Sequence, residues 1–171
     1  TIDWLPPVAL ITLFAPEEQA GVDLLGRDLR ARMPDCQSVQ VQHRYEKSGP
    51  VSVVLGPKIS DLVINEGQLK FRLRLGHARN TGLFLDMRTG RDWVRQHSQD
   101  KRVLNLFSYT CGFSVAAVAG GAHSVLNVDM SSAALAVGRD NHRLNGRPPA
   151  QVGFEKLDIF KSFGRLKKRG P

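Results

Sequence analysis

Short apolar runs alternate with helical segments along the second half of the chain, and this alternation constrains the fold more than any other feature of the sequence. The pattern comprises a strand at residues 103–107, a helix at 114–119, a strand at 125–128, a helix from Ser131 or Ser132 towards Asn145, and a weaker strand at 152–157. Strands that alternate with helices are typical of a parallel sheet of the doubly wound α/β class. We therefore expect one domain with such a sheet at residues 79–171.

Residues 1–78 have a different pattern, which predicts a small α+β domain in front of the parallel sheet. The expected elements are strands at 8–14, 38–44 (half-buried) and 51–55, a helix between Pro16 and Met33, and a hairpin with strands at 62–64 and 69–75. The second hairpin strand alternates apolar residues with Lys70, Arg72 and Arg74. This alternation predicts one buried and one basic face.

The charge of the chain narrows the class of partner. The 171 residues include 24 Lys and Arg against 16 Asp and Glu, which gives a net charge of +8. A basic surface concentrates polyanions and favours a nucleic acid as partner, whereas charge clusters on their own are usually solvated faces. The clusters lie between Lys70 and Arg102 and between Lys161 and Arg169.

Composition also indicates the compartment. Two cysteines in this length exclude a disulfide scaffold and fit a reducing compartment, so we expect a cytoplasmic protein. The longest apolar run, at residues 8–15, is far shorter than a membrane span, and no secretory signal pattern is visible. No membrane association is expected.

A strand, a tight turn and a helix at residues 103–117 form the arrangement that binds nucleotide-like ligands at the carboxyl edge of an open α/β sheet. Gly112 in the turn would let the backbone approach a ligand. Asp129 follows the second strand and can accept hydrogen bonds from both hydroxyls of a ribose. Asp158 follows the third strand and can accept a bond from the amine of a base. The alternative is a packing glycine with acids that cap helices.

The turn also separates two classes of ligand. Dinucleotide-binding turns carry G-x-G-x-x-G, in which three glycines admit a pyrophosphate. The turn Ser108-Tyr-Thr-Cys-Gly112 has one glycine, so a ligand with an amino-acid tail and a ribose fits better. A nicotinamide-dependent oxidoreductase is the weaker alternative.

Four segments resemble class I S-adenosylmethionine-dependent methyltransferases, and most closely the branch that methylates bases of large-subunit ribosomal RNA. The segments are Asn80–Arg88, Lys101–Ser114, Asn127–Ser131 and Asn141–Gly146. The resemblance implies a Rossmann-like α/β sheet, which we expect to be incomplete, preceded by the small α+β domain. It further implies S-adenosyl-L-methionine as cofactor, RNA (ribosomal rather than transfer RNA) as partner, and no metal.

The resemblance also implies site residues. The expected cofactor-binding set is Asp86 and Arg88 near the methionine end, Phe107, Ser108, Tyr109 and Gly112 in the loop, Asp129 and Met130 at the ribose, and Asp158 with the backbone of Ile159 at the adenine. Tyr109 fits a ligand stack or an ordinary packed aromatic equally well. Cys111 stands where the family has a small residue such as glycine, and we interpret it as a small buried filler.

One family segment is not visible in the sequence. After the third acid the family has an acid-Pro-Pro-aromatic segment that forms the pocket for the target base, and nothing after Asp158 provides it. Pro148-Pro149 comes too early. We therefore expect that this chain binds the cofactor and is inactive alone. The sequence assigns no catalytic residue. An RNA-binding module without chemistry is the alternative function. An unpaired apolar sheet edge would favour dimers.

Overall fold

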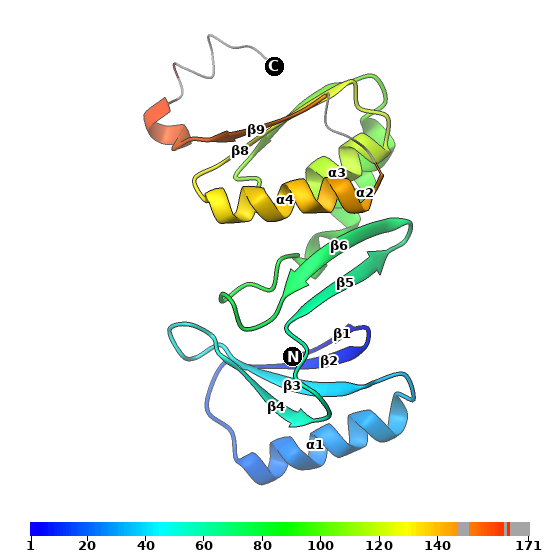
Figure 1. Ribbon diagram of the computed structural model, residues 1–171, viewed down its shortest axis with the longest axis vertical. Coiled ribbons are helices and arrows are strands. Elements are labelled where there is room, and N and C mark those ends of the chain that lie inside the picture. The colour runs from blue at the N-terminus through cyan, green and yellow to red at the C-terminus, as the bar shows by residue number, and fades with distance from the viewer. Residues whose placement is uncertain (147–150, 163, 165–171) are drawn as a thin grey trace. The chain divides into compact units, whose positions relative to one another are not determined.

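The computed structural model describes residues 1–146, 151–162 and 164, so Pro148-Pro149 and the basic residues from 165 onwards lie outside the described residues. The chain forms two compact units, which we describe separately. Unit 1 comprises residues 1–64 and 73–81, and unit 2 comprises residues 65–72 and the chain from residue 82 onwards (Figure 1). Among the described helices, none has the length and apolar character needed to cross a membrane.

Unit 1 contains a four-stranded sheet with one helix on a face (Figure 1). Its elements are β1 (Ile2–Leu5), β2 (Val8–Leu13), α1 (Gln19–Arg32), β3 (Ser38–His43) and β4 (Val51–Leu55), and the strand order is β1-β2-β3-β4. β2 and β3 are parallel, while the outer pairs are antiparallel. Val22 of α1 packs on Ala9, Ile11, Val39 and Val41 of the sheet. The sequence pattern had not indicated β1, a strand of four residues.

The expectation that β3 is half-buried was wrong. Gln40 and Gln42, which face away from its valines, are as buried as those valines. The Gln40 side-chain amide donates to the carbonyl oxygen of Ile59 at 2.9 Å, and the Gln42 amide donates to that of Arg79 at 3.0 Å. These bonds make the burial of two polar side chains tolerable.

A hairpin of β5 (Asp61–Glu66) and β6 (Leu69–Arg74) follows, and residues 65–72, which comprise the end of β5, the turn and most of β6, belong to unit 2. The one-turn 3-10 helix η1 (Leu85–Met87) leads into α2 (Arg88–His97). Arg91 of α2 forms a two-pronged ion pair with Glu66, at 2.7 and 2.6 Å, and donates to the Phe84 carbonyl oxygen. The two side chains are only 3% and 10% exposed. Arg91 is therefore not part of a solvated basic face.

The parallel sheet of unit 2 confirms the predicted alternation. It consists of β7 (Arg102–Leu106), α3 (Gly112–Ala119), β8 (Ser124–Asp129), α4 (Ser132–Leu144) and β9 (Val152–Lys156), with strand order β7-β8-β9. α2, α3 and α4 cover one face of it, rather than both faces (Figure 1). The strands follow one another in a single direction, and right-handed crossovers then place successive helices on the same side. The β7 residue Leu104 is 43% exposed, in keeping with a sheet that these helices cover on one face.

A chain of polar side chains, of which Asn105 is half-buried and the others are buried, joins the sheet to two of these helices. The side-chain nitrogen Nδ2 of Asn105 donates to the side-chain oxygen Oδ1 of Asn127 at 2.9 Å, and Nδ2 of Asn127 donates to the Ser114 hydroxyl at 3.0 Å. The same hydroxyl lies 2.8 Å from Nε2 of His142 on α4. Burial lowers the pKa of His142 to about 4, so the ring is neutral at physiological pH.

The Arg91–Glu66 pair gives a first prediction about stability. Glu66→Gln leaves a buried guanidinium without a counter-charge, so we expect the free energy of unfolding to fall by about 3–5 kcal/mol. The double variant Glu66→Gln/Arg91→Met should lose less than the sum of the single variants. Urea denaturation measures both. Asp28→Asn breaks the exposed Asp28–Arg32 pair and serves as the control, with an unchanged midpoint. Additive effects of the two substitutions would contradict this role of the pair.

His142 predicts a pH dependence. Its pKa is lower in the folded chain than the ordinary value of 6.5, so the unfolded chain binds the proton first as the pH falls. The free energy of unfolding should therefore decrease from about pH 6.5 to about pH 4, by roughly 3 kcal/mol from this group. In denaturation series across this range, His142→Gln should lose that part of the slope, whereas the exposed His97→Gln should keep it. Equal slopes in all three proteins would refute the assignment.

Candidate cofactor-binding site

The loop between β7 and α3 has an unusual backbone. Phe107, Tyr109 and Cys111 have φ angles of 52°, 48° and 63°, so three side-chain-bearing residues adopt the left-handed conformation within five positions. Each such residue costs roughly 1–2 kcal/mol, and strained residues of this kind cluster at functional sites. The surrounding structure must therefore hold this loop in place.

Asp129, at the end of β8, provides the principal hold. One carboxylate oxygen accepts the backbone N–H of Tyr109 at 2.7 Å, and the other accepts that of Ser131 at 2.8 Å. The Ser108 N–H donates to the carbonyl oxygen of Val128 at 3.1 Å. The predicted ribose-binding acid thus fixes the predicted cofactor loop directly.

Thr110 ties the same loop to two other elements. Its hydroxyl donates to the Gly82 carbonyl oxygen, and its own carbonyl oxygen accepts the Asn141 amide at 2.9 Å. The ring of Phe84 lies 5.5 Å from that of Tyr109, whose pKa is raised by burial. The segment that begins at Gly82 therefore packs on the loop.

Asp86 and Arg88, the two polar residues expected near the methionine end, are less closely involved. Both are exposed, on η1 and at the first position of α2. Within the described residues neither forms a hydrogen bond or an ion pair with the loop.

Cys111 is confirmed as a buried residue, at 0% exposed. Burial raises the pKa of its thiol to about 12, so the thiol stays protonated. Its sulfur fills the space beside Gly138 of α4, where an added Cβ would lie 2.4 Å from Sγ. Cys111 therefore packs α4 against the loop while holding a backbone conformation that suits glycine.

Gly112 and Ser108 differ in what surrounds them. A Cβ on Gly112 would lie 3.1 Å from Cδ1 of Leu83 and 3.5 Å from Cδ of Arg91, so side chains of the protein occupy the space that a side chain there would need. The Ser108 hydroxyl is buried beside Cys111 and lies in no hydrogen bond of normal geometry among the described residues. A buried hydroxyl of this kind is suited to meet a ligand.

The carboxyl end of β9 reaches the same edge of the sheet. Asp158 accepts the backbone N–H of Phe160 at 3.1 Å and lies 3.7 Å from the Lys161 ammonium, while Ile159 is buried. The ring of Phe160, 85% exposed, lies 5.8 Å from that of Phe107, 62% exposed. Phe160 was absent from the predicted set, although an aromatic two residues after the third acid was visible in the sequence.

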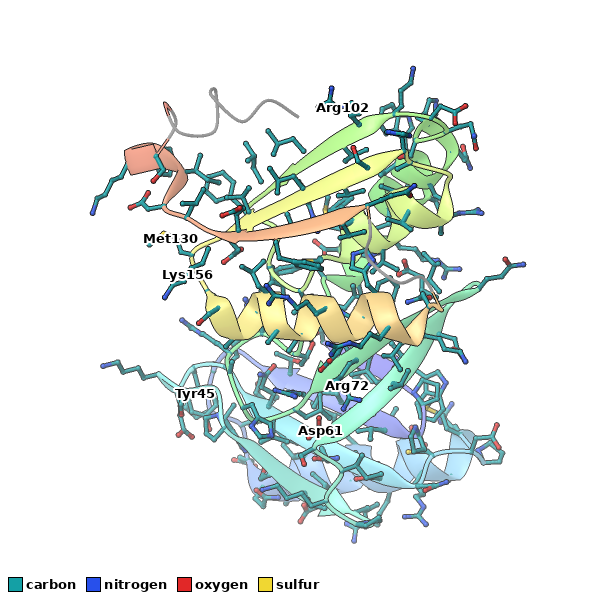
Figure 2. All side chains as sticks on the ribbon, turned by 45° about the horizontal axis from the view of Figure 1, so that its top comes forward. Tyr45, Asp61, Arg72, Arg102, Met130 and Lys156 are labelled. Atoms are coloured by element: carbon teal, nitrogen blue, oxygen red, sulfur yellow. The ribbon has the colours of Figure 1, made fainter. Side chains whose placement is uncertain are left out.

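The strand ends show how these residues come together. Met130, which is 63% exposed, and Lys156 lie at one end of the parallel strands, and Arg102 lies at the other (Figure 2). The structure thus gathers the predicted residues that follow β7, β8 and β9 at one edge. In the described parts of the chain, no group of three or more His, Cys, Asp or Glu side chains could hold a metal.

The contact between Cys111 and Gly138 gives a prediction about this loop. Gly138→Ala forces a methyl group against the thiol and should lower the free energy of unfolding by about 1–3 kcal/mol. Cys111→Gly removes the sulfur and suits the left-handed backbone, so adding it should restore most of the loss. Gly21→Ala on the open face of α1 is the matched control and should stabilise by about 0.5–1 kcal/mol. Additive effects in urea denaturation would disprove the contact.

Comparison with known proteins finds methyltransferases that are similar to this chain in sequence and in structure. A ribosomal RNA large subunit methyltransferase I from Aeromonas hydrophila is 34% identical over 155 residues, which cover 86% of this chain and 39% of that relative. The chain therefore spans about two fifths of that relative's length. A solved Streptococcus mutans structure, assigned as a SAM-dependent methyltransferase, is 25% identical with a TM-score of 0.89 over 98% of this chain and 44% of that one.

A further solved structure with the same identity, TM-score and coverage is a protein assigned as a methyltransferase in complex with SAH. These likenesses confirm the predicted Rossmann-like α/β fold. The family model for S-adenosylmethionine-dependent methyltransferases matches residues 1–171 of this chain. The cofactor of this family is the one predicted from the sequence. Because the match includes the parallel strands and the loop that Asp129 holds, the chain belongs to the S-adenosylmethionine-dependent methyltransferase family.

Proposed function

We propose that this chain is the cofactor-binding part of a methyltransferase that transfers a methyl group from S-adenosylmethionine to a base of ribosomal RNA. The observation that carries the proposal is the Asp129 carboxylate, which holds the strained loop after β7 through the Tyr109 amide at 2.7 Å. An acid and a loop in this relation form the ligand edge of an open α/β sheet.

The residues at this edge fit such a cofactor. Each oxygen of Asp129 accepts one backbone N–H, and a carboxylate oxygen has a second lone pair, so both remain able to accept a ribose hydroxyl. The exposed rings of Phe107 and Phe160 offer apolar surface to an adenine, with Asp158 and Ile159 beside them. The buried Ser108 hydroxyl supplies a further polar contact.

The remaining predicted residues take supporting places in this proposal. Tyr109 and Gly112 contribute through the loop backbone, and Met130 follows the ribose-binding acid. Asp86 and Arg88 lie on the segment that packs on the loop and would face the amino-acid end of the cofactor.

The bound cofactor supplies a sulfonium that makes its methyl group electrophilic. The residues of this chain bind and orient that cofactor, and the rate advantage comes mainly from proximity and alignment. No general acid or base is assigned to this chain. The target base would have to be exposed or turned out of its helix.

The proposed substrate is RNA, and ribosomal RNA in particular. A relative 34% identical is named for ribosomal RNA of the large subunit, and the net charge of +8 suits a polyanion. Family membership supports an enzyme over an RNA-binding module without chemistry. Because the chain spans 39% of that relative, we propose that the target base is held by other parts of the enzyme.

Calorimetric titration with S-adenosylhomocysteine tests the cofactor part of this proposal. The chain should bind this ligand. Asp129→Ala should weaken binding at least about thirtyfold, because the two proposed hydrogen bonds from the ribose hydroxyls to the carboxylate are lost. Asp92→Ala, which removes an exposed acid from α2, is the matched control and should bind as the unsubstituted chain does. A folded chain that gives no heat with this ligand but a raised melting temperature with NAD would overturn the proposal.

A further inference from the structure

Asn141 of α4 and Asn145, the residue that caps the C-terminal end of that helix, bond to the backbone of β6, and both lie in unit 2 with the part of β6 that they contact. The side-chain oxygen Oδ1 of Asn145 accepts the backbone N–H of Lys70 at 2.9 Å, and its side-chain nitrogen Nδ2 donates to the Lys70 carbonyl oxygen at 2.8 Å. The side-chain oxygen Oδ1 of Asn141 accepts the backbone N–H of Arg72 at 2.8 Å. Residues four apart on a helix share a face, so α4 acts as a hydrogen-bonding neighbour for the strand.

Asn141 has a second partner that Asn145 lacks. Its amide donates to the carbonyl oxygen of Thr110 at 2.9 Å, between the left-handed Tyr109 and Cys111. The Asn141 side chain is 0% exposed. A carboxamide is planar, so the positions of the two atoms it contacts are fixed together. One side chain thus joins the hairpin to the loop.

We propose that Asn141 is a positioning residue for the cofactor loop, which it couples to the β5–β6 hairpin. If the hairpin shifts, the Thr110 carbonyl loses its donor in a buried setting, and an unsatisfied buried group is unfavourable. Binding at the loop and the placement of the strand that carries Lys70 and Arg72 therefore favour each other, and such coupling is reciprocal. The cofactor itself rests on the function proposed above.

Asn141→Asp tests the bond to Thr110. A protonated Asp can still accept from Arg72 and donate to Thr110, whereas an ionised one faces the Thr110 carbonyl with a negative charge. Burial raises the pKa of a carboxyl, so the new acid should ionise as the pH rises from 5.5 to 8.0. The nearby His142, with a pKa of about 4, and Cys111, with a pKa of about 12, keep their charge states over this range. Arg72 on β6 is the arginine that contacts Asn141, through its backbone N–H.

Calorimetry with S-adenosylhomocysteine at both pH values gives the readout. We expect Asn141→Asp to bind within threefold of the unsubstituted chain at pH 5.5 and at least tenfold more weakly at pH 8.0. Asn145 has no bond to the loop, so the ratio of the Kd of Asn145→Asp to the Kd of the unsubstituted chain should be the same at both pH values. A constant ratio for Asn141→Asp in a folded protein would overturn the positioning role. Absence of binding by the unsubstituted chain would instead count against the proposed function.

Hydrogen exchange gives a second measurement of the coupling, one part of it with the ligand bound and one part without ligand. In the unsubstituted chain, bound S-adenosylhomocysteine should slow exchange of the Arg72 amide and leave amides of β3 unchanged. Without ligand, Asn141→Asp should lower the protection of the Tyr109 and Cys111 amides at pH 8.0 relative to pH 5.5. An Arg72 amide that is unaffected by the ligand, or loop protection that is unaffected by the substitution, would overturn the coupling.

Discussion

The Asp129 carboxylate joins the loops that follow two neighbouring parallel strands. It accepts the backbone N–H of Tyr109 after β7 and that of Ser131 after β8. Bonds to a charged acceptor are roughly twice as strong as neutral ones, which allows them to offset the left-handed backbone at Phe107, Tyr109 and Cys111. The acid also stands at the N-terminus of α4, where negative charge is favourable. The relative positions of the loops after β7 and β8 therefore depend on this side chain.

The rest of unit 2 supports the same loop through polar bonds between distant parts of the sequence. Thr110 bonds to Gly82 and to Asn141, and Asn141 also bonds to the backbone of Arg72. The pair of Arg91 and Glu66 holds the hairpin turn to α2. Buried polar bonds are directional, so together they specify one arrangement of these elements. These bonds connect hairpin residues 65–72 to the rest of the second unit.

The order of strands and helices and the acids at the strand ends were predictable from the sequence, because periodicity and end residues are local signals. The exceptions required contacts across the fold. Arg91 appears in the sequence among solvated charges, yet its partner Glu66 lies 25 residues away. Gln40 resembles the outer face of a half-buried strand, yet its amide meets a carbonyl 19 residues later. Periodicity does not reveal such partners, and left-handed backbone at aromatic residues has no sequence signal.

The three left-handed residues also refine the choice between ligand classes. In a glycine-rich loop such positions have no side chains, which lets a pyrophosphate reach the backbone. Here Phe107 extends towards Phe160, Tyr109 packs near Phe84, and Cys111 fills the space beside Gly138. These positions therefore carry side chains where a glycine-rich loop has none, and the packing of Tyr109 and Cys111 helps to hold the loop in its conformation. A loop fixed in advance loses little freedom on binding, and exposed aromatic surface beside an acid suits an adenosine without phosphates.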